Sequence, residues 1–106
     1  SRKEESAKIL KKYTDKCPII VENSKKSTLE KLDKCKFLVP NDLTIAQFMV
    51  VLRKRIKISN EESFFLFIND NILVSSSQTV SNVYSSYKNE DGFLYLTYCN
   101  ENTFGK

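Results

Sequence analysis

Apolar residues recur at helical spacing in the middle of the chain. In the segment 45–56 they stand three or four positions apart, which places them on one face of a helix. Thr44 and Gln47 form a T-x-x-Q capping box, in which each side chain satisfies a backbone N–H of the first turn. Basic residues at 53–57 fill the last turn, where positive charge complements the helix dipole. The pattern predicts a helix that begins after Thr44 and packs one face on a core.

Short β-rich runs flank this helix on both sides. PIIVEN and CKFLVP precede it and FFLFI and FLYLTYC follow it, at 18–23, 35–40, 64–68 and 93–99. FFLFI is apolar at successive positions, which is typical of a central strand buried on two sides. After an NDN turn, ILV at 72–74 indicates a short return strand, and the apolar spacing at 80–87 predicts a short helix.

The front of the chain predicts one more helix. SRKEESAKILKKY has a narrow apolar edge at Ile9 and Leu10, and it should end before Pro18, which disfavours helical geometry in the residue before it. This order of elements predicts an α+β domain with the ubiquitin-like β-grasp fold, a four-stranded mixed sheet and an N-terminal helical extension. We expect a single domain over 1–106, with the helix at 1–14, the β-grasp core at 15–99 and a flexible tail at 100–106.

Composition narrows the class of protein. The chain has 106 residues, 41% of them hydrophobic and 28% charged, which is typical of one globular domain. No apolar run approaches the roughly 20 residues of a membrane span, and SRKEESAKIL lacks the apolar core of a signal peptide. With three cysteines and no signal, we expect a reducing, cytoplasmic compartment. The net charge of +4 fits acidic partners, anionic membranes or nucleic acid and does not choose among them.

Residues that could support catalysis are scarce. The chain has no histidine, no C-x-x-C pair and only two glycines, so it offers no His-based general base and no phosphate-binding loop. We therefore expect no catalytic residue, metal or cofactor. The R-K-R-I-K run at 53–57 lacks the interleaved aromatics of a nucleic-acid surface, so a solvated helix end is the better interpretation and no nucleic-acid partner is predicted.

The strand CKFLVP carries the most informative surface pattern. Alternate side chains of a strand face opposite ways, so Lys36 and Leu38 share one face and Phe37 and Val39 share the other. If both faces are incompletely covered, two apolar pockets with basic rims flank one strand edge. Such an edge could receive an extended, acidic peptide by strand addition. On the residues alone, ordinary core packing is the better explanation of these side chains.

A family resemblance changes this balance. KKYTDKCPIIVE, LDKCKFLVPNDLTIAQF, LRKRI, FFLFIND, VYSSYKNEDGFLYLTY and the terminal TFG occur in the order and spacing of the GABARAP-type family of autophagy modifiers. The match runs from about residue 5 to Gly105, and LVP-x-D-L-T followed by Q-F and RKRI is its most specific part. The chain is identified on these segments as resembling a ubiquitin-like modifier of that family.

The resemblance implies a fate for the C-terminus. In the family a dedicated cysteine protease exposes a C-terminal glycine, which activating and conjugating enzymes join to phosphatidylethanolamine. The matching glycine is Gly105; Lys106 would be removed, and Phe104 would be held by the processing enzymes. Such a modifier would be cytoplasmic, and bound to the autophagosomal membrane when lipidated.

The resemblance also implies a receptor site for a short aromatic-x-x-aliphatic motif that adds to the second strand. The aromatic pocket maps to Glu5, Ile9, Pro18, Ile20, Lys36, Leu38 and Phe93. The aliphatic pocket maps to Phe37, Val39, Pro40, Leu43, Phe48, Val51 and Leu52. A cationic rim for the acids that precede the motif maps to Lys16, Lys34 and Arg55.

The chain also departs from the family pattern. It begins about where the second family helix starts, which puts in doubt any role of the first helix in membrane tethering. Leu73-Val74 replaces a common diproline, one extra residue falls within SSSQT, and Gly92 replaces an aromatic found in many members. Two other roles stay open: a modifier that acts on other organelle membranes or on protein lysines, and a binding adaptor that is never conjugated.

Overall fold

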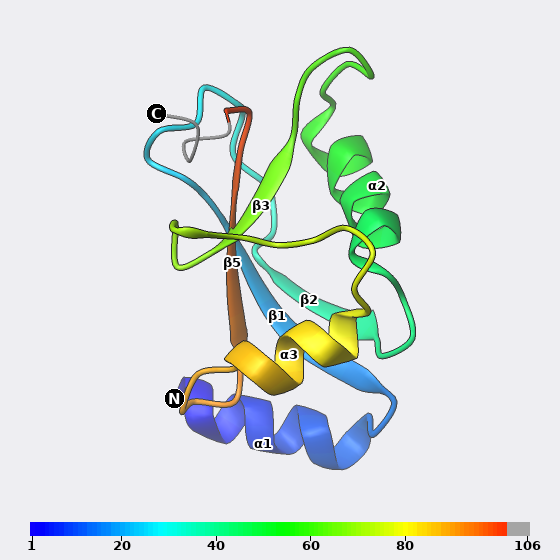
Figure 1. The fold of residues 1–106 in the computed structure, drawn as a ribbon. Helices are drawn as coiled ribbons and strands as arrows, with labels where there is room; N and C mark the ends of the chain where they lie inside the picture. The colour runs from blue at the N-terminus through cyan, green and yellow to red at the C-terminus, as the bar shows by residue number, and fades with distance from the viewer. Residues whose placement is uncertain (102–106) are drawn as a thin grey trace.

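The computed structural model describes residues 1–101, and the predictions for Phe104, Gly105 and Lys106 lie outside the described residues. The elements are α1 (Arg2–Lys12), β1 (Lys16–Asn23), β2 (Lys36–Pro40), α2 (Ile45–Ile56), β3 (Phe65–Ile68), β4 (Ile72–Leu73), α3 (Val80–Tyr87) and β5 (Leu94–Cys99). Their order is the one that the hydrophobic pattern predicts (Figure 1).

The strands form one mixed sheet in the order β2-β1-β5-β3-β4. β1 runs parallel to β5 at the centre, and every other neighbouring pair is antiparallel. The sheet therefore has five strands, and the expected count of four was wrong by one. The added strand is the return segment: Ile72 and Leu73 pair with β3, and the Val74 N–H then donates to Leu66 O at 2.9 Å. A proline at position 74 would have no N–H to make this bond.

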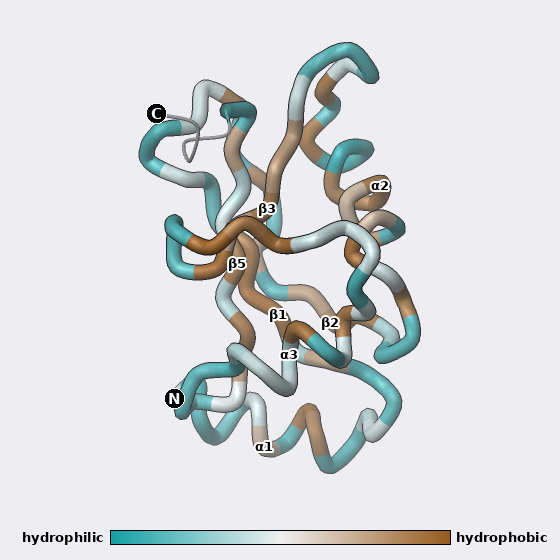
Figure 2. Tube along the Cα trace, viewed as in Figure 1, coloured by the Kyte–Doolittle hydropathy of each residue, from teal (hydrophilic) through white to brown (hydrophobic). Residues whose placement is uncertain are grey.

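β1 is buried on both of its faces, from Cys17 to Val21. Ile19 and Val21 belong to the main core, which α2 covers with its apolar face. Ile20 points the opposite way and is also fully buried. Figure 2 shows hydrophobic positions concentrated on the strands and hydrophilic ones on the loops and much of α1. A strand covered on both sides fits the centre of a sheet that contains a parallel pair.

The N-termini of α2 and α3 are joined by backbone hydrogen bonds. The predicted capping box of α2 is present: Thr44 N–H donates to Gln47 Oε1 at 2.9 Å, and Gln47 N–H donates to Thr44 Oγ1 at 3.2 Å. The next N–H groups of α2, at Ile45 and Ala46, donate to carbonyls at Gln78 and Ser76. Those of α3, at Val80 and Ser81, donate in turn to carbonyls at Leu43 and Asn41. Both helix starts are thus satisfied by each other's connecting loops.

Two isoleucines provide a matched test of this core. Ile56 is 2% exposed at the end of α2, whereas Ile72 is 40% exposed on β4. We expect Ile56→Ala to lower the free energy of unfolding by about 2–4 kcal/mol, because it leaves a cavity in the main core. Ile72→Ala should cost less than about 1 kcal/mol, since much of its side chain is already in water. Urea denaturation followed by circular dichroism measures both, and equal losses would contradict this core assignment.

Candidate functional site

β2 is an outer strand of the sheet and lies beside the predicted site residues. β2 pairs with β1 on one side, and no other strand within residues 1–101 pairs with its other side. Bonds from Val21 N–H to Cys35 O and from Asn41 N–H to Asp15 O extend the β1–β2 pairing beyond both ends of the strand. Such an edge presents backbone N–H and C=O groups to a further strand.

Side chains of β2 alternate between two surroundings. Lys36 and Leu38 are exposed, and Leu38 keeps 39% of its surface in solvent. Phe37 and Val39 are buried in the main core beside α2. The alternation predicted from CKFLVP is therefore present, and the two faces of this one strand meet different parts of the protein.

A cavity of about 210 Å³ lies on the α1 side of β2. Its lining is Glu5, Ile9, Lys34, Lys36, Phe37, Leu38 and Phe93. Five of the residues mapped to the aromatic pocket are thus brought together. The remaining two, Pro18 and Ile20, are buried in β1 and pair with Leu38 and Lys36. A larger groove of about 510 Å³ lies between α2 and β3–β4, but no charged residue lines it.

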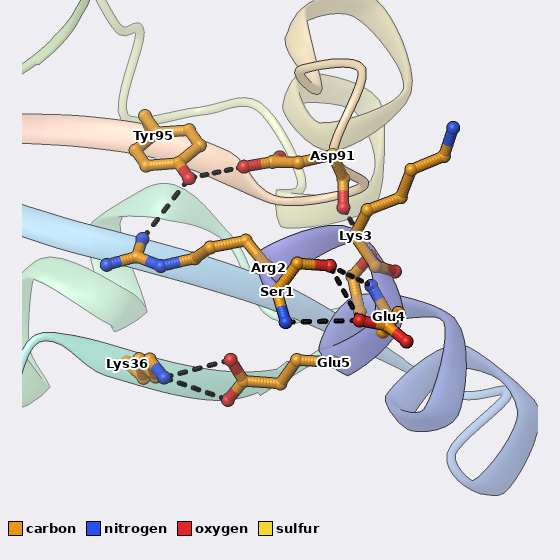
Figure 3. Close-up of polar contacts among 9 residues, drawn as sticks. Ser1, Arg2, Lys3, Glu4, Glu5, Lys36, Asp91 and Tyr95 are labelled. Atoms are coloured by element: carbon orange, nitrogen blue, oxygen red, sulfur yellow. Dashed lines mark hydrogen bonds and ion pairs between the residues drawn. The ribbon is translucent and has the colours of Figure 1, made fainter.

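Charged groups stand at the mouth of the cavity. Lys36 Nζ lies 2.9 Å from both carboxylate oxygens of Glu5, so this ion pair joins β2 to α1 (Figure 3). Lys34 Nζ lies 5.2 Å and Arg55 Cζ 5.8 Å from the centroid of the Phe37 ring. Cations over an aromatic face are attracted by its quadrupole. Lys16, the third residue of the predicted cationic rim, is half-buried and opens β1 opposite Pro40.

The residues mapped to the aliphatic pocket gather on the α2 side of β2. Phe37 and Phe48 pack edge to face with ring centroids 5.7 Å apart. Phe48 and Leu52 are 1% and 0% exposed, so both are full members of the core, as is Val39. The accessible members are Val51, Leu43 and Pro40, of which Val51 is 44% exposed. A guest side chain on this face would meet those three residues first.

Sequence reasoning missed two features of the site. It assigned Phe37 to the aliphatic face alone, whereas Phe37 also lines the cavity on the α1 side. It also gave no sign of the polar contacts that join α1 to β5 and to the loop before β5 (Figure 3). Those contacts link positions 85 to 93 residues apart, and no local pattern reports a bond of that span.

Two buried ionisable groups, the thiol of Cys17 and the hydroxyl of Tyr84, have raised pKa values and stay protonated at neutral pH. Cys17 is buried and its thiol donates to Asn41 Oδ1 at 3.0 Å. Burial raises the pKa of Cys17 to about 11, which disfavours the nucleophilic thiolate. Burial likewise raises the pKa of Tyr84, whose hydroxyl donates to Gly92 O at 2.6 Å. Within residues 1–101, no group of three or more Cys, Asp or Glu residues could hold a metal ion.

The arrangement defines a class of protein. A mixed sheet with a central parallel pair, one long helix across a face and an open edge strand is the β-grasp architecture of ubiquitin-like proteins. None of the helices that the structure describes is long and apolar enough to cross a membrane.

Comparison with known proteins identifies the family. The family model described as "Autophagy protein Atg8 ubiquitin like" matches residues 1–105. Autophagy-related protein 8e of Arabidopsis thaliana is 52% identical over 104 residues, which cover 98% of this chain and 84% of that protein. Autophagy-related protein 8 of Schizosaccharomyces pombe is also 52% identical and is covered over 85% of its length. The crystal structure of Trypanosoma brucei ATG8 superposes with a TM-score of 0.88 at 45% identity, over 93% of this chain and 84% of that one.

The chain belongs to the Atg8 family of ubiquitin-like autophagy proteins. It is a modifier rather than an enzyme, and it acts in autophagosome formation through lipidation. The resemblance read from its sequence segments and the α+β, ubiquitin-like fold are thereby confirmed.

Thiol reactivity tests the described surroundings of the three cysteines. Cys35 is exposed, whereas Cys17 and Cys99 are buried. At pH 8 only about one Cys17 side chain in a thousand would be thiolate, given its raised pKa of about 11. We expect one thiol per folded chain to react rapidly with a disulfide reagent, and Cys35→Ser to abolish that phase. Three fast thiols in the folded protein would contradict these burial assignments.

Proposed function

We propose that this protein recruits receptors through the edge of β2 while Gly105 is joined to phosphatidylethanolamine. The observation that carries the proposal is the open edge of β2, which has an apolar surface on each of its two faces. The receptor would add an extended segment to this edge, using backbone hydrogen bonds for affinity and side-chain contacts for specificity.

The spacing of an aromatic-x-x-aliphatic motif fits this geometry. Side chains three positions apart in a strand point to opposite faces. An added strand would therefore direct its aromatic ring into the cavity beside Glu5 and Ile9, and its aliphatic side chain toward Val51 and Pro40. A motif with one intervening residue fewer or more would place both side chains on the same face and forfeit one of the two contacts.

The charge around the edge favours acidic receptors. Lys34 and Lys36 line the cavity, and Lys34 and Arg55 lie over the Phe37 ring. Acidic residues before the motif would meet these cations, which speeds encounter and fixes the register of the guest strand. Because the side chains are largely exposed, this contribution should weaken with salt.

The C-terminal end supports the conjugation step. Family membership extends to residue 105, which is the glycine followed by Lys106. A cysteine protease would remove Lys106 after recognising Phe104, and activating and conjugating enzymes would then handle the new carboxylate. Glycine suits this position because a backbone without a Cβ enters a narrow enzyme cleft and leaves the carboxylate open to attack. The modifier would be cytoplasmic before conjugation and on the autophagosomal membrane after it.

Two related roles would be supported only by outcomes that contradict this assignment. In one, Gly105 is joined to protein lysines or to lipids of other organelles, which the mass of the adduct distinguishes. In the other, the protein is a binding adaptor that is never conjugated. Recruitment to membranes that is independent of Gly105 would favour the adaptor.

Peptide titration tests the receptor site. An acidic peptide with an aromatic-x-x-aliphatic motif should bind the wild type, and Lys36→Ala should weaken it about 5- to 10-fold, which lies within the range of a lost hydrogen bond at an exposed site. Phe37→Ala should weaken it at least as much, because Phe37 borders both faces. Lys54→Ala is the matched control, since Lys54 is an exposed lysine of α2 that does not line the cavity.

Calorimetry measures these affinities, and circular dichroism verifies that the Phe37 variant is folded. Equal affinity of the wild type and the Lys36 and Phe37 variants would contradict docking at β2.

A second experiment tests Gly105. In a reaction with activating and conjugating enzymes and vesicles that contain phosphatidylethanolamine, the chain ending at Gly105 should form a lipid adduct visible by gel shift and mass. Gly105→Ala, also ending at residue 105, should reduce the adduct at least about 10-fold, because the added methyl group crowds the reacting carboxylate. Undiminished lipidation of the alanine variant would argue that glycine is not required at position 105 as the acyl donor. A protein adduct without a lipid adduct would favour the first alternative.

A further inference from the structure

Helix α1 forms one wall of the aromatic cavity, yet it is attached to the protein with little apolar burial. Glu5 and Ile9 of α1 line the cavity. Of the 11 residues of this helix, the only buried one is Ser6, a serine. Polar contacts add to this attachment, and they gather at the first turns of α1 (Figure 3).

The first contact joins Ser6 to the loop before β5. The Ser6 hydroxyl donates to the backbone carbonyl of Asp91. The next residue, Gly92, has a φ of 89°, and a Cβ atom there would lie 2.9 Å from Ser6 Cβ and overlap the Ser6 hydroxyl. Only glycine allows the helix and the loop to approach this closely.

The second contact is a chain of polar groups that begins at Arg2. Arg2 Nη1 donates to the Tyr95 hydroxyl at 3.2 Å, and that hydroxyl donates to Asp91 Oδ2. Asp91 Oδ1 accepts from the backbone N–H of Phe93 at 2.9 Å. Burial and the bond to Asp91 raise the pKa of Tyr95, so its hydroxyl stays protonated and donates at neutral pH.

Arg2 also lies over the aromatic rings of Phe93 and Tyr95, and Phe93 forms a wall of the cavity. Its guanidinium carbon lies 5.8 Å from the centroid of the Phe93 ring and 5.7 Å from that of Tyr95. Phe93 lines the cavity together with Glu5 and Ile9. The polar contacts thus connect two walls of one cavity: the wall formed by α1 and the wall formed by Phe93.

We propose that Arg2, Ser6, Asp91, Gly92 and Tyr95 form a polar latch that sets the width of the aromatic cavity and so determines which aromatic side chain it accepts. These are positioning residues, because Arg2 and Tyr95 act through α1 and Phe93 rather than by direct contact with the guest. This inference rests on the proposed receptor function. Loss of these polar contacts would free α1 to move outward and would widen the cavity. In a wider cavity a phenyl ring would keep fewer contacts than the larger indole ring.

The test compares two peptides that differ only in the aromatic residue, Trp-x-x-Leu and Phe-x-x-Leu with the same preceding acids. Tyr95→Phe removes only a hydroxyl, and Arg2→Ala removes the cation and its hydrogen bond. Each should weaken the phenylalanine peptide about 3- to 10-fold, the range of a lost hydrogen bond, and the tryptophan peptide at least about 3-fold less. Arg2→Lys retains a cation over the two rings and should restore most of the discrimination.

Arg53→Ala is the matched control. Arg53 also stacks on an aromatic ring, with Cζ 5.6 Å from the Phe64 centroid, and it also donates hydrogen bonds, to Ser59 O and Glu62 O. It does not line the cavity. A general loss of stability would affect both peptides equally in any variant, whereas a latch changes their ratio only in the Arg2 and Tyr95 variants.

Amide hydrogen exchange of α1 gives a readout that needs no peptide. The N–H of Tyr13, which donates to Ile9 O at 2.7 Å, should exchange several-fold faster in Tyr95→Phe and Arg2→Ala than in Arg53→Ala. Unchanged exchange, or an unchanged ratio of the two affinities, would overturn the latch. If the wild type binds neither peptide, both the proposed receptor function and the proposed role of the latch in specificity are wrong. Amide hydrogen exchange in the Arg2 and Tyr95 variants would still show whether the polar contacts hold α1 in place.

Discussion

The parallel pairing of β1 with β5 is the constraint on which the rest of the architecture depends. β1 uses one edge for β5 and the other for β2, so β2 stands at the margin of the sheet. A strand in such a pair is stable when both of its faces are covered, and β1 is accordingly buried from Cys17 to Val21. The helices that provide this cover border the exposed edge of β2. The candidate site is therefore a consequence of strand order rather than of any single motif.

The two helices beside that edge are held by different kinds of interaction. α2 buries four apolar residues in the main core, so its position is set by close packing. α1 buries a serine and is held by directional polar contacts with the loop before β5. Packing spreads its energy over many atoms, whereas a hydrogen bond is lost with one group. The two sides of the site are thus attached differently: close packing holds the helix on the aliphatic side, and directional polar contacts join the helix on the aromatic side to the rest of the protein.

Much of this structure could be predicted from the sequence, for local reasons. The capping box at Thr44, the helical spacing of 45–56 and the alternation in CKFLVP are short-range patterns, and each is present as predicted. The short return strand at 72–74 was indicated by the sequence, but the expected sheet of four strands did not include it. Membership of the sheet depends on pairing, and β4 joins the sheet through its pairing with β3. The bonds of Arg2 and Ser6 with Tyr95 and Asp91 could not be predicted from local sequence patterns. They form only when the first and last parts of the chain come together in the fold.

The side chains along β2 have one more consequence, which concerns copies of the protein itself. An uncovered strand edge is a template for aggregation, and conjugation would crowd many copies onto one membrane. Pro40 has no N–H to contribute to a ladder between copies. Lys34 and Lys36 would bring like charges together if two such edges met. The same residues that would favour an acidic receptor strand would thus disfavour pairing between two copies of the protein.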